Sequence, residues 1–222
     1  MVMTKMHGTD DLVTVEVGAT LLEGLLRMPE HAIGVVLFAH GSGSSRFSPR
    51  NNYVASRLLH AGIATLLVDL LTEQEDQDYS KRFEISLLIQ RLYGAAKWLR
   101  RNARTSKLPL GLFGASTGAA AALEVAAQWH KDEPDNICAI VSRGGRPDLA
   151  SREALEKVSA PTLLIVGGMD GQVIEFNQKA YSFLRCEKQL EIVPGATHLF
   201  EESGALTRVS ELSIDWFLRY MK

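Results

Sequence analysis

The feature of this chain that most limits its fold is a regular alternation of short apolar runs with longer stretches of helical periodicity. Continuous apolar runs of this kind are typical of strands that are buried on both faces. Strands that alternate with helices imply right-handed βαβ crossovers, and so an α/β fold with a mostly parallel, doubly wound sheet. The predicted parallel strands are residues 34–38, 64–68, 110–113, 137–141, 162–166 and 189–193.

The start of the chain follows a different pattern. Residues 13–17 and 21–26 flank Gly18 and predict an antiparallel strand pair. A chain of 222 residues suits one domain over residues 1–222, because chains usually split only beyond about 250–300 residues. The predicted helices are residues 50–61, 82–102, 117–130, 147–158, 175–184 and 206–221.

Charge and hydropathy exclude several classes of partner. The formal net charge is −2, so we expect no binding to nucleic acid or to an anionic membrane. No apolar run approaches the roughly 18 residues of a membrane helix, and residues 1–11 lack the apolar core of a signal peptide. Cys138 and Cys186 have no metal-ligand spacing. These features predict a cytoplasmic protein with a small-molecule substrate, and they leave its oligomeric state open.

A nucleophile motif stands at the end of the third predicted parallel strand. Residues 110–113 lead into Gly114-Ala115-Ser116-Thr117-Gly118, which is followed by an Ala-rich helix. This is G-x-S-x-G in the strand–turn–helix context that the motif requires, where small neighbours permit a sharp, strained turn that exposes the serine hydroxyl. Ser116 is therefore the candidate nucleophile. The alternative is that Ser116 only caps the helix.

A serine hydroxyl needs a base, and the base needs an acid to orient it. Asp170 follows the strand at 162–166, and His198 follows the strand at 189–193. Both lie at the strand ends where Ser116 is expected, in the chain order Ser, Asp, His. The alternatives are that Asp170 only shapes a turn and that His198 is an ordinary loop residue. Glu175 is a second candidate acid, but it falls inside a predicted helix.

An acyl-transfer enzyme also has to stabilise an oxyanion, usually with two backbone N–H groups. The Thr117 N–H follows the nucleophile, and the Ser42 N–H lies in the Gly-rich loop after the strand at 34–38. These two groups are the candidate oxyanion donors. A phosphate-binding loop is the competing interpretation, but the G-x-x-x-x-G-K-[ST] pattern is absent. We expect His40 to support this turn rather than act as a second base.

Together these segments resemble the motifs of the α/β-hydrolase superfamily, over about residues 12–222. Within that superfamily, the compact size and the His-Gly-Ser-Gly-Ser-Ser loop at 40–45 resemble bacterial dienelactone hydrolase-like proteins. Characterised members of that group use a cysteine nucleophile, whereas Ser116 stands at that position here. The resemblance implies an α/β-hydrolase fold and a hydrolytic triad of Ser116, Asp170 and His198.

Several features bear on the substrate. Only residues 142–160 separate two predicted strands where related hydrolases insert a cap domain, so we expect no cap.

The acidic segment 71–79 is a candidate for a loop that covers the site. The alternative is that this segment is solvated surface. Arginines follow two of the strands at the active edge and would bind an anionic substrate, or pair internally with Asp69, Asp148 or Glu73. These are Arg46, Arg50, Arg143 and Arg146.

The sequence therefore predicts a serine hydrolase that cleaves an ester, lactone or related acyl bond through an acyl-enzyme. Two other function classes remain open. One is an acyltransferase that uses the same triad, and the other is a non-catalytic ligand-binding member of the fold. No motif in the chain indicates a metal ion or a cofactor, and we expect none.

Overall fold

The structure is a computed structural model that describes residues 8–129 and 137–221. An eight-stranded sheet runs through these residues in the order β1-β2-β4-β3-β5-β6-β7-β8. β2 lies antiparallel to β1 and to β4, whereas all neighbouring strands from β4 to β8 are parallel. The predicted α/β class is confirmed. The strands are Gly8–Val17 (β1), Thr20–Pro29 (β2), Gly34–Ala39 (β3), Ile63–Val68 (β4), Leu110–Ala115 (β5), Ile137–Arg143 (β6), Thr162–Gly167 (β7) and Lys188–Val193 (β8).

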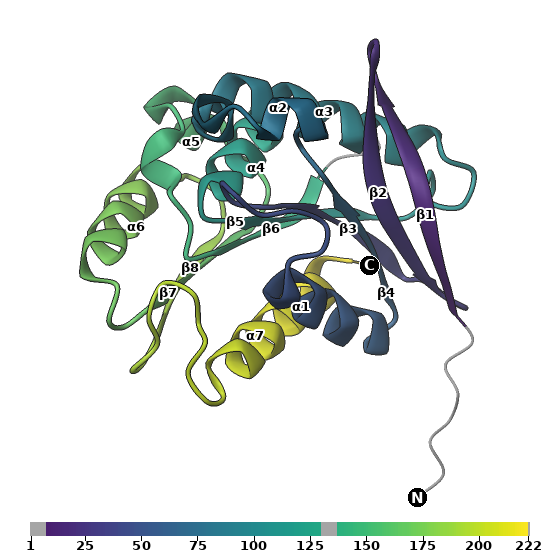
Figure 1. Cartoon of the computed structure of the whole chain (residues 1–222). Helices are drawn as coiled ribbons and strands as arrows, with labels where there is room; N and C mark the ends of the chain where they lie inside the picture. Colours follow the sequence, from purple (N-terminus) through teal and green to yellow (C-terminus); the bar gives the residue numbers. More distant parts are fainter. Residues whose placement is uncertain (1–7, 130–136, 222) are drawn as a thin grey trace, which may run out of the picture.

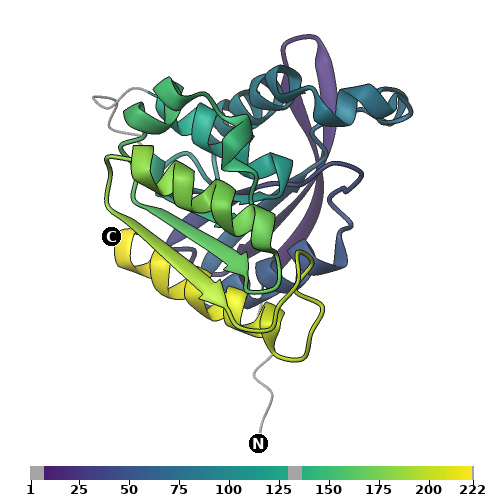
Figure 2. The ribbon, with the colours of Figure 1, turned by 90° about the vertical axis from the view of Figure 1, so that its left-hand side faces the viewer.

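Helices cover both faces of this sheet (Figure 1). α1 and α7 pack together on one face, while α3, α4, α5 and α6 follow one another across the other face. Figure 2 shows the β8 edge of the sheet, with α6 on one side and α7 on the other. The arrangement is doubly wound, as predicted. The helices are Pro49–His60 (α1), Glu73–Asp76 (α2), Ile85–Arg101 (α3), Thr117–Gln128 (α4), Arg152–Lys157 (α5), Gly171–Phe183 (α6) and Ala205–Tyr220 (α7), with 3₁₀ turns at Tyr79–Phe83 (η1) and Pro147–Leu149 (η2).

Two apolar layers hold the helices to the sheet. On the α3/α4 face, Leu92 and Leu112 belong to one buried cluster. On the α1/α7 face, Phe38 and Phe113 lie with their ring centroids 4.7 Å apart and share a cluster with Phe217. Full burial of one such side chain contributes about 1.5–3 kcal/mol. The central strands β3, β4, β5 and β7 are buried along their whole length, which explains their continuous apolar runs.

One predicted helix is interrupted in the structure. Instead of a single helix over 147–158, the chain forms η2 and then α5. Pro147 is the first residue of the 3₁₀ turn. Ser151 has an extended conformation, and its side chain accepts a hydrogen bond from the Ala154 N–H at 3.1 Å. Serine is a strong N-cap, so a second helix starts at this point and the prediction of one continuous helix was wrong.

The other five predicted helices exist with somewhat different bounds. α6 begins at Gly171, before the predicted start of 175–184. α4 ends at Gln128, and residue 130 of the predicted helix 117–130 lies outside the described residues.

The acidic segment 71–79 is partly helical. The Thr72 hydroxyl accepts from the Glu75 N–H at 3.2 Å, and the Glu75 carboxylate accepts from the Thr72 N–H at 2.9 Å. This reciprocal capping box starts the short α2. Glu84 has φ −76° and ψ 84°, outside the helical region, so α3 begins at Ile85 rather than at residue 82.

The connection between β6 and β7 contains only η2 and α5, so no cap domain lies there. In the part of the chain that the structure describes, no helix has the length and apolarity to cross a bilayer.

Candidate active site

Ser116 lies at the turn between β5 and α4, which the glycines on both sides make possible. It has a φ of 50°, a conformation that residues other than glycine rarely adopt. A Cβ atom on Gly118 would come within 2.2 Å of the Ala39 carbonyl oxygen. A Cβ atom on Gly114 would come within 2.4 Å of the Ala119 Cα. The turn therefore brings α4 so close to the sheet that only glycine fits at these two positions.

We predict that Gly114→Ala lowers the free energy of unfolding by about 1–3 kcal/mol, because the new methyl group meets backbone atoms of α4 that cannot rotate away. Urea unfolding would measure the loss. Gly171→Ala is the matched control, since a Cβ atom there meets nothing within 4 Å. We expect the control to change stability by no more than about 0.5 kcal/mol. Equal stability of the two variants would contradict the close approach of α4.

His198 and Asp170 meet across the loops that follow β8 and β7. His198 Nδ1 lies 2.6 Å from Asp170 Oδ2. The two loops are tied together by the Met169 N–H, which donates to the Ala196 carbonyl at 2.9 Å. With the Nδ1 proton directed at the carboxylate, Nε2 is left without a proton and able to accept one. Glu175, the second candidate acid, lies in α6, and the ion pair of His198 is with Asp170.

Ser116 and His198 line the same cavity, which has a volume of about 250 Å³. In the described part of the chain, Ser116 Oγ makes no hydrogen bond to His198, whose ring is held by Asp170. Such contacts are often long before substrate binds. The cavity lies at the carboxyl ends of β3, β5, β6 and β8. Its lining consists of Gly41, Ser42, Ser44, Ser48, Arg50, Ala115, Ser116, Arg143, His198 and Leu199.

The two candidate oxyanion donors come together beside Ser116. Thr117 is the first residue of α4, so its N–H has no acceptor within the helix. The Ser42 N–H donates to the Thr117 hydroxyl at 3.0 Å. A Cβ atom on Gly41 would lie 2.9 Å from the Ser116 Cβ, so the loop passes directly beside the nucleophile. To bind an oxyanion, the Ser42 N–H would have to leave the Thr117 hydroxyl or be shared between the two acceptors. No local sequence pattern indicates this contact between Ser42 and Thr117.

His40 is buried beneath this loop. The Leu70 N–H donates to His40 Nε2 at 2.9 Å, and His40 Nδ1 lies 2.9 Å from the Gly41 carbonyl oxygen. The ring therefore carries its proton on Nδ1 and is neutral, and burial holds the pKa of His40 below its ordinary value. These contacts place His40 in a supporting position between β3 and the segment after β4.

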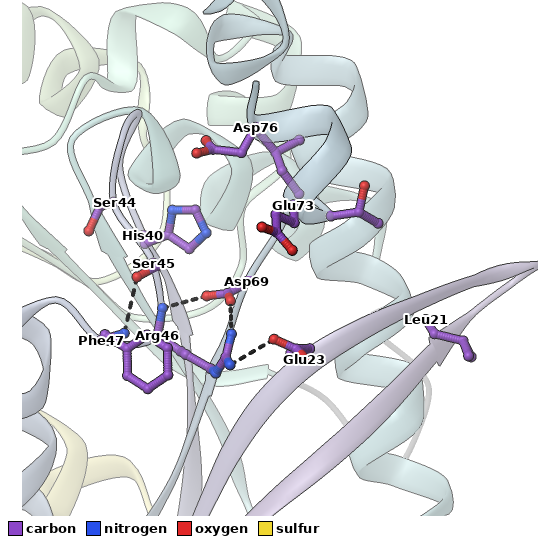
Figure 3. A pocket seen from close by; sticks show the side chains of 12 residues that line it. Leu21, Glu23, His40, Ser44, Ser45, Arg46, Phe47, Asp69, Glu73 and Asp76 are labelled. Carbon is purple, nitrogen blue, oxygen red and sulfur yellow. Dashed lines mark hydrogen bonds and ion pairs between the residues drawn. The ribbon is translucent and has the colours of Figure 1, made fainter. Parts of the chain in front are cut away.

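Two of the four candidate arginines pair with carboxylates away from the Ser116 cavity. Arg46 contacts Asp69 and Glu23 in a second cavity of about 450 Å³ (Figure 3). Arg146 binds Asp148 through two bonds of 2.8 Å. These are the internal pairings that the sequence left open. Neither side chain is among those that line the cavity at Ser116.

The other two arginines line the Ser116 cavity. Arg143 is only 7% exposed, and burial lowers the pKa of its guanidinium to about 10 with a further contribution from Arg50. Arg50 contacts Glu201 at 2.8 Å. The sequence pattern did not single out Ser48 or Asn51, which lie beside them at the start of α1. Ser48-Pro49 is a helix-start signal that could have found them.

No three His, Cys, Asp or Glu side chains among residues 8–129 and 137–221 are grouped so that they could hold a metal ion.

The chain is similar to solved hydrolase structures over nearly its whole length. A dienelactone hydrolase from Anabaena variabilis is 52% identical, with a TM-score of 0.91, and the match covers 97% of this chain and 99% of that one. Est1E from Butyrivibrio proteoclasticus is 16% identical, with a TM-score of 0.79 and coverage of 95% and 98%. At that identity, the second match shows the fold alone.

Among curated proteins, two from Mycobacterium tuberculosis strains, both provisionally named phosphoribosyl transferase, are 52% identical over 212 residues. The match covers 96% of this chain and 47% of each relative, so the chain spans about half of their length. No protein-family model matches the chain. The fold and the near-complete match to the Anabaena enzyme show that the chain belongs to the dienelactone hydrolase-like group of α/β hydrolases.

Proposed function

We propose that this protein is a serine hydrolase that cleaves an ester, lactone or related acyl bond of a small molecule through an acyl-enzyme. The observation that carries the proposal is the His198–Asp170 bond of 2.6 Å, with His198 and Ser116 on the wall of one cavity. A nucleophile, a base and an orienting acid at the ends of three strands are the set that acyl transfer needs.

In the proposed reaction, Ser116 Oγ attacks the acyl carbonyl while His198 Nε2 accepts the hydroxyl proton. Asp170 stabilises the imidazolium without taking the proton. The oxyanion is held by the Thr117 N–H and by the Ser42 N–H once the latter leaves the Thr117 hydroxyl. The tetrahedral intermediate then collapses, the leaving group takes the proton from His198, and the acyl group remains on Ser116. Water, deprotonated by His198, releases the acid and restores the serine.

The name given to the Mycobacterium tuberculosis relatives suggests a different chemistry, the transfer of a phosphoribosyl group. Because this chain spans 47% of those proteins, the name describes a chain about twice as long. The residues around Ser116 support acyl chemistry, since an oriented base beside a serine at a strand-to-helix turn activates a nucleophile.

The test is to trap the acyl-enzyme. We expect a p-nitrophenyl ester panel to give a burst of p-nitrophenolate, and a fluorophosphonate probe to add its mass to the peptide that carries Ser116. Product analysis with added alcohols distinguishes hydrolysis from acyl transfer: the free acid as main product supports a hydrolase. Labelling at another residue, or no labelling at all, would refute the proposed nucleophile.

A further inference from the structure

A buried cation without a carboxylate partner lies beside Ser116. Arg143 ends β6 and is 7% exposed. Among the described residues its Nε has no hydrogen-bond partner, and its NH2 group has only a long contact of 3.4 Å to the Asn51 side-chain oxygen. The Phe200 ring lies 5.9 Å from the guanidinium carbon. Burial of a charge costs several kcal/mol unless the charge is paired. An anion that binds from the cavity would reduce this cost for Arg143.

Arg50 adds a second guanidinium to the same cavity. Its side chain is 31% exposed, and its carboxylate contact, Glu201, is 62% exposed. The Nε of Arg50 is buried and has no partner among the described residues. Two guanidinium groups that line one small cavity repel each other, and a bound anion would relieve that repulsion.

The N-terminus of α1 also faces this cavity, since Ser48 and Arg50 both line it. The helix has 12 residues and no acidic side chain in its first turn. Pro49 has no N–H, and the Asn51 N–H donates to Ser48 Oγ at 3.3 Å. The Arg50 N–H is therefore a first-turn donor without an acceptor in the helix. A helix end of this kind favours a negative group.

We propose that Arg143, Arg50 and the N-terminus of α1 bind a terminal phosphate group of the substrate whose ester is cleaved at Ser116. The donors favour phosphate over carboxylate. Two guanidinium forks and a backbone N–H offer more N–H groups than the two oxygens of a carboxylate accept, whereas a phosphate monoester has three terminal oxygens.

The inference rests on the proposed acyl transfer at Ser116 and names the class of substrate for that site. Ser116, His198 and Arg143 line one cavity, so a phosphate held by Arg143 would anchor the acyl arm beside the nucleophile. Asp170 is occupied by His198 and does not neutralise Arg143.

Binding can be tested without turnover. In the Ser116→Ala variant, at constant ionic strength, we expect inorganic phosphate to raise the unfolding temperature, as any ligand of the native state does. The double variant that also carries Arg143→Met should lose most of that rise. The control is the double variant that carries Arg152→Met instead, and it should keep the rise, because Arg152 pairs with Glu156 on α5. Equal rises in all three variants would reflect phosphate acting as a general stabilising salt and would overturn the proposal.

Turnover is tested with p-nitrophenyl esters of three acids of similar length: butyrate, succinate and 3-phosphonopropionate. We expect kcat/KM to be about 10- to 100-fold higher for the phosphonate than for butyrate, with succinate between them. In Arg143→Met the ratio of kcat/KM for the phosphonate to that for butyrate should fall to about one, whatever the absolute rates, while Arg152→Met should keep the wild-type ratio. A wild-type enzyme that prefers succinate or butyrate, or an Arg143→Met variant that keeps the phosphonate preference, would overturn the proposal.

The thermal stability of Arg143→Met distinguishes a role of Arg143 in substrate recognition from a structural role. Because Arg143 is a buried charge without a carboxylate, we expect Arg143→Met to unfold at the same or a higher temperature. A variant that unfolds at a lower temperature and keeps the phosphonate preference would identify Arg143 as structural.

If Arg143→Met does not fold, Arg50→Met replaces it in the phosphate titration. We then expect phosphate to raise the unfolding temperature of Arg50→Met less than that of the parent. If no ester is hydrolysed but phosphate binding depends on Arg143, the proposed function fails and the anion site stands.

Discussion

Ser116→Ala is expected to lower kcat for ester hydrolysis by about three orders of magnitude or more, with little change in KM. The acyl-enzyme route needs an oxygen at this position to form the covalent bond. In the variant, a water molecule would have to attack the carbonyl instead. The turn holds Ser116 at a φ of 50° beside the cavity, but it does not hold a water molecule in that position. Residual activity would come from the oxyanion donors and substrate binding alone.

The measurement is steady-state hydrolysis of the best ester in the panel, corrected for the spontaneous rate. Ser182→Ala is the matched control, because that serine is exposed near the end of α6, where its hydroxyl donates to the Lys179 carbonyl. We expect the control to keep full activity. Ser116→Ala should fold as the parent does, since the Ser116 side chain makes no cap bond at α4. Full turnover in a folded Ser116→Ala variant would show that another group is the nucleophile.

Asp170→Asn is expected to lower kcat by about 10⁴-fold while the fold stays intact. His198 Nδ1 lies 2.6 Å from the Asp170 carboxylate, which accepts the Nδ1 proton. An amide at this position would donate its N–H to Nδ1 and move the ring proton to Nε2. His198 could then no longer accept the Ser116 proton, and the developing imidazolium would lose its adjacent negative charge.

Glu175→Gln is the control for this substitution, because it removes the second candidate acid in the same way. We expect Glu175→Gln to keep kcat close to the parent value, since Glu175 lies in α6 and the His198 contact is to Asp170. A large loss in Glu175→Gln together with an active Asp170→Asn would reverse the choice of acid.

The sequence by itself determined the class of fold and the positions at which chemistry was expected. Continuous apolar runs predicted the strands because, in a strand that is buried on both faces, successive side chains are apolar on both sides. The alternation with helices determined that these strands are parallel, and in a parallel sheet all carboxyl ends lie at one edge. Ser116, Asp170 and His198 each follow a predicted strand, so local pattern and chain direction were sufficient to bring them to one edge.

The tertiary structure decided which polar groups at that edge are already occupied. Arg46 and Arg143 both follow strands and look equivalent in the sequence, yet Arg46 meets Glu23 and Asp69, whereas Arg143 meets no carboxylate in the described residues. Likewise, the Thr117 hydroxyl holds the Ser42 N–H across 75 positions of sequence. Such pairings depend on loop positions to within an ångström or two. Periodicity reports which face of an element is buried, but it carries no information about which side chains from distant loops meet.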